Sequence, residues 1–166
     1  MKGTIATLTR TLRLISLLVL LSLVFTPLVN AGPLRPAPGE FTMVMTGVDT
    51  GTGELIFEGW KTGALPGHLT ARAALIKQTG VALHLATRWT LVTPWGEQID
   101  GENTAILNPK SLHIQEHGVI VDATGDLAER IGNFVVIHGT VSDTYFLPGT
   151  TSVTARVTYV PSQAVQ

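Results

Sequence analysis

The stretch VALHLATRWTLV, residues 81–92, decides the fold. Large apolar side chains recur at every second position, and Thr87 is the one polar member of that series. The intervening positions are small, polar or charged, and include His84 and Arg88. Because successive side chains of a β-strand point to opposite faces, a period of two indicates a strand with one buried face. We therefore expect the face of Leu85 and Trp89 to belong to the core.

The chain beyond residue 40 repeats this alternation in short runs between glycine-bearing turns. Further strands are predicted over residues 41–46, 54–60, 69–75, 97–100, 104–107, 112–116, 119–123, 133–141 and 153–159. Turns are expected between them, including one at Asp100-Gly101, and one helical turn is expected over residues 126–130 with Asp126 as its N-cap. Some eight to ten short strands without helices to cover sheet edges predict an all-β domain, a single small antiparallel β-barrel, with a β-sandwich as the alternative.

The first 31 residues read as a cleaved secretory signal peptide. Lys2, Arg10 and Arg13 form a basic start, residues 14–25 carry no charge, and Val29-Asn30-Ala31 suits cleavage near Ala31. The alternative is a retained anchor, but an apolar run of 12 residues is shorter than the roughly 20 that a spanning helix needs. The mature protein is therefore expected to be secreted or periplasmic, and to meet a membrane only through the transient signal peptide.

The remaining chain divides into three expected parts. Residues 32–40 contain three prolines and should be an extended tether, residues 41–160 form the barrel, and residues 161–166 are a C-terminal tail. The leader holds three of the 11 Lys and Arg and none of the 12 Asp and Glu, so eight cationic and 12 acidic residues remain, a formal charge of −4. A mildly acidic domain without a basic cluster is a poor candidate for binding nucleic acid.

The chain contains no cysteine. Small exported domains often use disulfides to stabilise an undersized core, and this one has to bury enough apolar surface without them. Thiol catalysis and thiolate metal sites are excluded as well.

A glycine pattern near the C-terminal third resembles a known family. Asp122-Ala123-Thr124-Gly125-Asp126-Leu127-Ala128, then Ile131-Gly132-Asn133-Phe134 and His138-Gly139-Thr140, resemble the rhythm of allene oxide cyclase and dirigent-like barrels, including small exported bacterial members. Ala123 stands where that family usually has a second glycine, and Ala128-Glu129-Arg130 replaces a small-residue turn. The resemblance implies a barrel fold and carries over no catalytic residue.

Five residues are candidates for ligand binding. His84 and Arg88 lie opposite the apolar face of their strand, so they line the lumen if that face points inward and the solvated surface if it points outward. Trp95, Tyr145 and Phe146 fall in expected loops, where they either contact a ligand at a barrel end or plug a closed core.

Other short motifs have a simpler local explanation. Asp49-Thr50-Gly51 matches half of an aspartic protease site but also a hairpin turn. His113 and His117, four residues apart on a strand, are separated by roughly 13 Å, and Gly118 suggests that His117 lies in a turn. Ser142-Asp143 near His138 is typical of a hydrogen-bonded turn. We predict no metal site and no cofactor.

Two classes of function therefore remain open. The first is non-catalytic binding of a small apolar or amphipathic molecule, or of a protein partner. The second is a cyclase-like or isomerase-like enzyme acting on an apolar molecule inside the barrel, as the resemblance implies. The sequence favours binding, assigns no catalytic residue and leaves the oligomeric state open. A lumen lined by small and polar side chains, including His84 and Arg88, would favour the enzyme, and an interior filled by apolar side chains with no cavity would leave binding at the surface.

Overall fold

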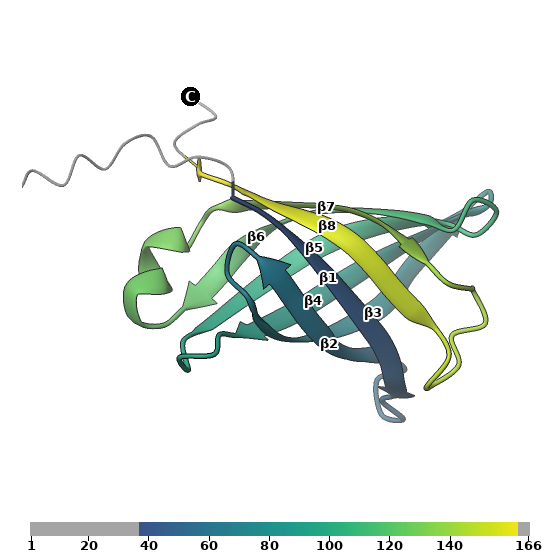
Figure 1. The fold of residues 1–166 in the computed structure, drawn as a ribbon. Coiled ribbons are helices and arrows are strands. Elements are labelled where there is room, and N and C mark those ends of the chain that lie inside the picture. Colours follow the sequence, from purple (N-terminus) through teal and green to yellow (C-terminus); the bar gives the residue numbers. More distant parts are fainter. Residues whose placement is uncertain (1–36, 163–166) are drawn as a thin grey trace, which may run out of the picture. The chain divides into compact units, whose positions relative to one another are not determined.

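A computed structural model describes residues 37–162 of the chain, and the predicted signal peptide lies outside the described residues. Eight antiparallel strands follow one another in sequence and space, and β8 pairs with β1 to close the sheet into a barrel (Figure 1). The strands are β1 (Ala37–Val48), β2 (Leu55–Gly63), β3 (Gly67–Thr79), β4 (Ala82–Val92), β5 (Gln98–Asn108), β6 (His113–Ala123), β7 (Phe134–Val141) and β8 (Ser152–Val160). The predicted all-β barrel is confirmed, and no strand edge is left unpaired around it.

The alternation that predicted β4 also sets its orientation. Leu85, Trp89 and Leu91 are buried in the core, whereas Arg88 is exposed on the outer surface. The other strands alternate in the same way, so the barrel interior is one continuous cluster of side chains such as Phe41, Met45, Ile99, Val135 and Val157. The apolar face is inside because burial of these side chains drives closure.

Two pairs of predicted strands are single strands in the structure. The segments expected at 97–100 and 104–107 are joined as β5, and those at 112–116 and 119–123 are joined as β6. The turn predicted at Asp100-Gly101 is wrong: β5 continues through these residues, and the β5–β6 register shift there marks a bulge whose extra residue, Val121, lies on β6. Gly118 likewise lies within β6, opposite Asn103, so the prediction that His117 lies in a turn is wrong too.

Two boundaries also differ from the prediction. β1 begins at Ala37, so residues 37–40 of the expected tether pair with β8 as part of the barrel. The predicted helical turn is a 3₁₀ helix, η1 (Gly125–Arg130), whose N-cap position is Thr124 and not Asp126. Asp126 instead donates its backbone N–H to the Glu97 carboxylate at 2.7 Å. β8 ends at Val160, where the barrel was expected to end.

The connections between strands lie alternately at the two ends of the barrel. The η1 end carries residues 64–66, residues 93–97 and η1 itself, which is the green helix beside β6 in Figure 1. The opposite end, which we call the Phe146 end, carries residues 49–54, 80–81, 109–112 and 142–151. Within residues 37–162, no helix is long and apolar enough to cross a membrane.

Candidate functional site: the barrel interior

The barrel interior contains a small, almost wholly apolar cavity. Its volume is about 60 Å³, and side chains from all eight strands line it. A cavity needs roughly 10 to 15 Å³ of such space to hold one water, so this one has room for only a few small groups. Three of the lining side chains, Lys61, Thr87 and Glu116, stand out because they are polar and buried. The cavity is thus an apolar space with polar groups at a few defined points.

A chain of hydrogen bonds crosses the interior from β4 to β6. Trp89 Nε1 donates to Asn103 Oδ1 at 3.2 Å, and Asn103 Nδ2 donates to Glu116 Oε2 at 3.1 Å. Thr87 Oγ1 donates to the same Glu116 oxygen at 3.1 Å. All four side chains are buried. The network fixes the Glu116 carboxyl beside the cavity and satisfies polar groups that would otherwise be costly to bury.

Two glycines make room for this network. Gly101 pairs with Trp89 across β4 and β5, and a Cβ at Gly101 would overlap the indole ring. Gly118 pairs with Asn103 across β5 and β6, and a Cβ there would overlap Asn103 Oδ1. Each glycine therefore leaves the inward space that a larger partner on the neighbouring strand fills.

Burial raises the pKa of the Glu116 carboxyl, and the hydrogen bonds from Asn103 and Thr87 offset only part of that rise. The folded protein therefore keeps the proton at pH values where the unfolded chain, with a pKa near 4.5, has lost it. The folded state binds more protons in this range, so the Glu116 contribution to stability falls as pH rises above about 4.5.

We expect Glu116→Gln to remove this pH-dependent loss. The amide oxygen still accepts from Asn103 and Thr87, and no buried carboxylate forms at higher pH. The variant should gain about 1 to 3 kcal/mol over the wild type between pH 4.5 and neutral pH, the scale of a buried polar group left without full compensation. Urea denaturation of both proteins across that range measures the difference. Glu102→Gln on the exposed face of β5 is the control, and a difference for Glu116→Gln that does not change with pH would contradict the argument.

Lys61 occupies the η1 end of the cavity. Its side chain is only 2% exposed, and Nζ lies 5.1 Å from the centre of the Tyr159 ring. Nζ donates to the carbonyl oxygens of Ala64 and Leu65, the latter at 2.9 Å. Burial, and secondarily the positive charge of Arg130, lowers the pKa of Lys61 to about 8. Burial also raises the pKa of Tyr159. The cavity thus ends on a buried ammonium held by main-chain oxygens.

Phe146 closes the other end. Among residues 37–162 it is the one cavity-lining residue outside the strands, it is half-buried against the core, and its φ is 51°. A positive φ is uncommon for a non-glycine residue and marks local backbone strain. The Asp143 carboxylate holds the loop by accepting from the Tyr145 N–H and the Thr151 hydroxyl, both at 2.9 Å. Phe146 is therefore a plug on a hydrogen-bonded loop.

The structure separates the five residues proposed from the sequence. His84 and Arg88 lie on the face of β4 opposite the core residues, outside the lumen, and Trp95 is an exposed loop residue at the η1 end. Tyr145 is 81% exposed at the Phe146 end, next to the plug. Of these five residues, only Phe146 lines the interior cavity.

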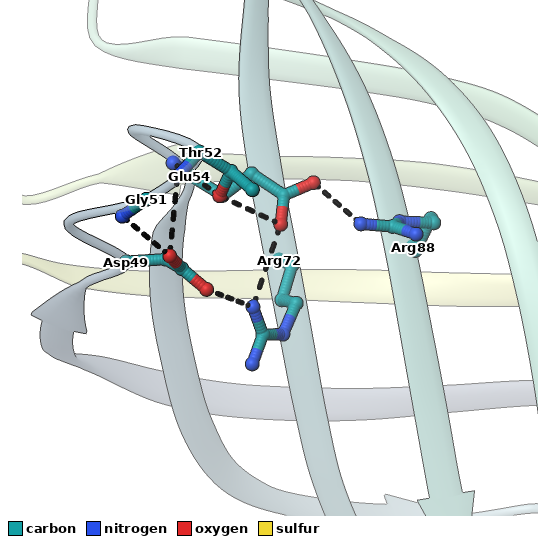
Figure 2. Close-up of polar contacts among 6 residues, drawn as sticks. All are labelled: Asp49, Gly51, Thr52, Glu54, Arg72 and Arg88. Atoms are coloured by element: carbon teal, nitrogen blue, oxygen red, sulfur yellow. Dashed lines mark hydrogen bonds and ion pairs between the residues drawn. The ribbon is translucent and has the colours of Figure 1, made fainter.

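Arg88 belongs to an ion-pair network on the outer surface (Figure 2). Arg88 and Arg72, from neighbouring strands, reach the two oxygens of Glu54 at 2.6 and 3.4 Å, and Arg72 also contacts Asp49 at 2.8 Å. The hydrogen bond from Arg72, followed by the backbone N–H groups of Gly51 and Thr52, lowers the pKa of Asp49. The Asp-Thr-Gly motif is thus a turn tied to β3 by an ion pair.

His113, His117 and His138 are exposed on the outer surface. His117 lies beside His138 on β7, with ring centres 6.3 Å apart, and His113 is farther along β6. Among residues 37–162, no three His, Asp or Glu side chains come together as a set of metal ligands. Ser142 Oγ donates to Asp143 at 3.0 Å within the loop, which is the local arrangement expected from the sequence.

Sequence reasoning missed Lys61, Asn103 and Glu116. Their signal is the period of two itself: Lys61 is two residues from Gly59 and four from Phe57, and Glu116 is two residues from Ile114. A polar residue in phase with a buried series is the pattern that could have found them.

Comparisons of the chain with protein-family models, with curated proteins and with solved structures found no match.

Proposed function

We propose that this protein is an exported, non-catalytic binding barrel that holds a small apolar or amphipathic molecule in its interior. The observation that carries the proposal is the apolar cavity of about 60 Å³, bounded by Phe146 at one end and by Lys61 at the other. Ligand sites in proteins are mostly apolar, with a few placed polar groups that orient the ligand. The leader peptide and the resemblance to exported barrels support a site of action outside the cytoplasm.

Ligand entry requires Phe146 to move. The resting cavity accommodates only a few non-hydrogen atoms, so a larger molecule needs the space that this ring occupies. The loop 142–151 is the natural place for such a change, because Phe146 contributes the only non-strand side chain to the cavity wall and has a strained backbone. The strands themselves are paired on both sides and resist opening.

Phe146→Ala should strengthen binding of apolar molecules. Removal of the ring enlarges the cavity, so toluene and 1-hexanol should raise the thermal unfolding midpoint more in the variant than in the wild type. A tenfold gain in affinity corresponds to about 1.4 kcal/mol of added stabilisation at saturating ligand. The variant without ligand should itself be less stable, because it loses buried apolar surface.

Tyr145→Ala is the matched control, because the neighbouring aromatic side chain lies outside the cavity wall. Tyr145→Ala should leave the affinities for toluene and for 1-hexanol unchanged. If neither compound shifts the midpoint of the wild type or of Phe146→Ala, interior binding is refuted. Native mass spectrometry of protein purified from its own host would then identify whatever the barrel does carry.

A cyclase-like or isomerase-like enzyme is the second candidate, and Glu116 favours it. A buried carboxyl that retains its proton beside an apolar cavity is the type of group that acts as a general acid. Glu116→Gln distinguishes an enzyme from a binding protein. The variant should still bind toluene whether the protein is an enzyme or a binding protein. Conversion of a bound compound by the wild type, and its loss in Glu116→Gln, would establish the enzyme.

A further inference from the structure

The η1 end of the barrel holds two cationic side chains with no acidic partner among residues 37–162. The ion pairs in that part of the chain involve Arg72, Arg88 and Arg156. Neither Lys61 nor Arg130 takes part in one. Arg130 lies close enough for its charge to act on both Lys61 and Tyr159. Buried charges in proteins are normally paired, so Lys61, a buried cation without an ion pair and with the positive charge of half-buried Arg130 acting on it, is unusual.

Both cations also have unused hydrogen-bond donors. An ammonium has three N–H groups, and the carbonyl oxygens of Ala64 and Leu65 accept from Lys61 Nζ. One N–H of Lys61 therefore remains. Arg130 Nε is buried and has no partner among the described residues. Leaving a buried donor unsatisfied is costly, so the arrangement points to an acceptor that comes from outside.

The position of Lys61 connects this charge to the cavity. Its side chain lies against Gly39, where no side chain competes for space, and it forms part of the cavity wall together with Phe41 and Tyr159. An anionic group placed at Lys61 would have apolar side chains directly behind it. A molecule with one charged end and an apolar remainder fits both features.

We propose that Lys61 and Arg130 form an anion-recognition site, and that the ligand of the barrel is a small organic carboxylate whose apolar tail lies in the cavity. This inference rests on the proposed function, because the tail occupies the same interior. The carboxylate would accept from the remaining N–H of Lys61 and from Arg130, which adds charge-assisted hydrogen bonds to apolar burial. A neutral molecule with the same tail would gain only the burial.

The test compares three probes with one tail and different heads: hexanoate, 1-hexanol and hexylamine. Isothermal titration calorimetry at pH 7 should give hexanoate at least tenfold higher affinity than 1-hexanol, and hexylamine the lowest affinity. Acetate, which has the head without the tail, should bind more weakly than hexanoate. If the wild type binds the probes too weakly to measure, the same titrations are carried out on the Phe146→Ala variant.

Lys61→Met should abolish the preference for hexanoate and leave the affinity for 1-hexanol within about twofold. Arg130→Met should reduce the preference as well. Lys110→Met is the control, because Lys110 is an exposed lysine at the Phe146 end, and it should retain the full preference. Circular dichroism of each variant confirms that it is folded.

A pH profile of the wild type keeps the test independent of any variant. Arg130 and Tyr159 are the charged or titratable groups that act on Lys61, whose own pKa is about 8. Affinity for hexanoate should therefore fall as pH rises above 8, whereas affinity for 1-hexanol should not. Equal affinities for hexanoate and 1-hexanol would overturn the anion site and leave interior binding intact. Failure of every probe to bind would overturn both proposals.

Discussion

Gly118→Ala is expected to destabilise the barrel by about 3 kcal/mol or more, a large fraction of the stability of an ordinary domain. A Cβ at this position would overlap both Asn103 Oδ1 and the carbonyl oxygen of Glu102 on the paired strand. A flexible side chain alone could move away, but the carbonyl belongs to the β5–β6 ladder. Relief of the overlap therefore requires the two strands to separate, which breaks their hydrogen bonds. Urea denaturation followed by circular dichroism measures the loss.

Gly47→Ala is the matched control for this substitution. Gly47 also lies in a strand, at the β1–β2 register shift, but a Cβ there meets nothing within 4 Å. Its stability should stay within about 0.5 kcal/mol of the wild type, because alanine there neither clashes nor strains the backbone. Equal effects of the two substitutions would mean that the overlap with Asn103 and Glu102 does not determine the loss of stability at position 118.

Trp89→Ala is expected to cost about 3 to 5 kcal/mol, the usual range for deletion of a buried aromatic side chain. The indole lies under Gly101, lines the cavity and donates to Asn103. Its removal enlarges an apolar cavity and leaves Asn103 Oδ1 without its donor. The same substitution should increase the binding of toluene, because the added space is apolar. Loss of stability and gain of binding are thus predicted together, and both are measured by thermal unfolding with and without toluene.

Two comparisons separate the contributions of Trp89. Trp89→Phe keeps an aromatic ring but loses the N–H donor, so it should cost less than Trp89→Ala. Trp60→Ala removes an indole that is 65% exposed and touches His68 edge-on with ring centres 5.2 Å apart. It should cost no more than about 1 kcal/mol. A loss for Trp60→Ala as large as that for Trp89→Ala would show that the outer surface, and not the interior network, carries the stability.

The candidate site illustrates how far the sequence pattern reaches. Alternation in residues 81–92 predicts that Trp89 lies on the core face and leaves open whether Arg88 faces a lumen or solvent; in the structure Trp89 is buried and Arg88 is exposed outside. The same rule, extended to polar residues in phase with buried ones, points to Glu116 and Lys61 as inward-facing residues. Glycine predicts a turn at Gly101 and at Gly118, but in the structure each of these glycines leaves room for a side chain of the adjacent strand. Both a tight turn and a close contact between strands favour glycine. Only the pairing of residues between neighbouring strands shows which of the two applies.

The sequence by itself determined that this protein is a chain of short antiparallel strands and which face of each strand is apolar, because strand geometry converts a period of two directly into two faces. Tertiary structure alone decided that Trp89, Asn103 and Glu116 meet, that Lys61 lies beside Tyr159, and that Phe146 closes the cavity. These contacts depend on the register between strands and on closure of β8 against β1, which join residues far apart in the chain. The period of two is a property of consecutive residues, whereas the contacts of the interior form only when the barrel closes.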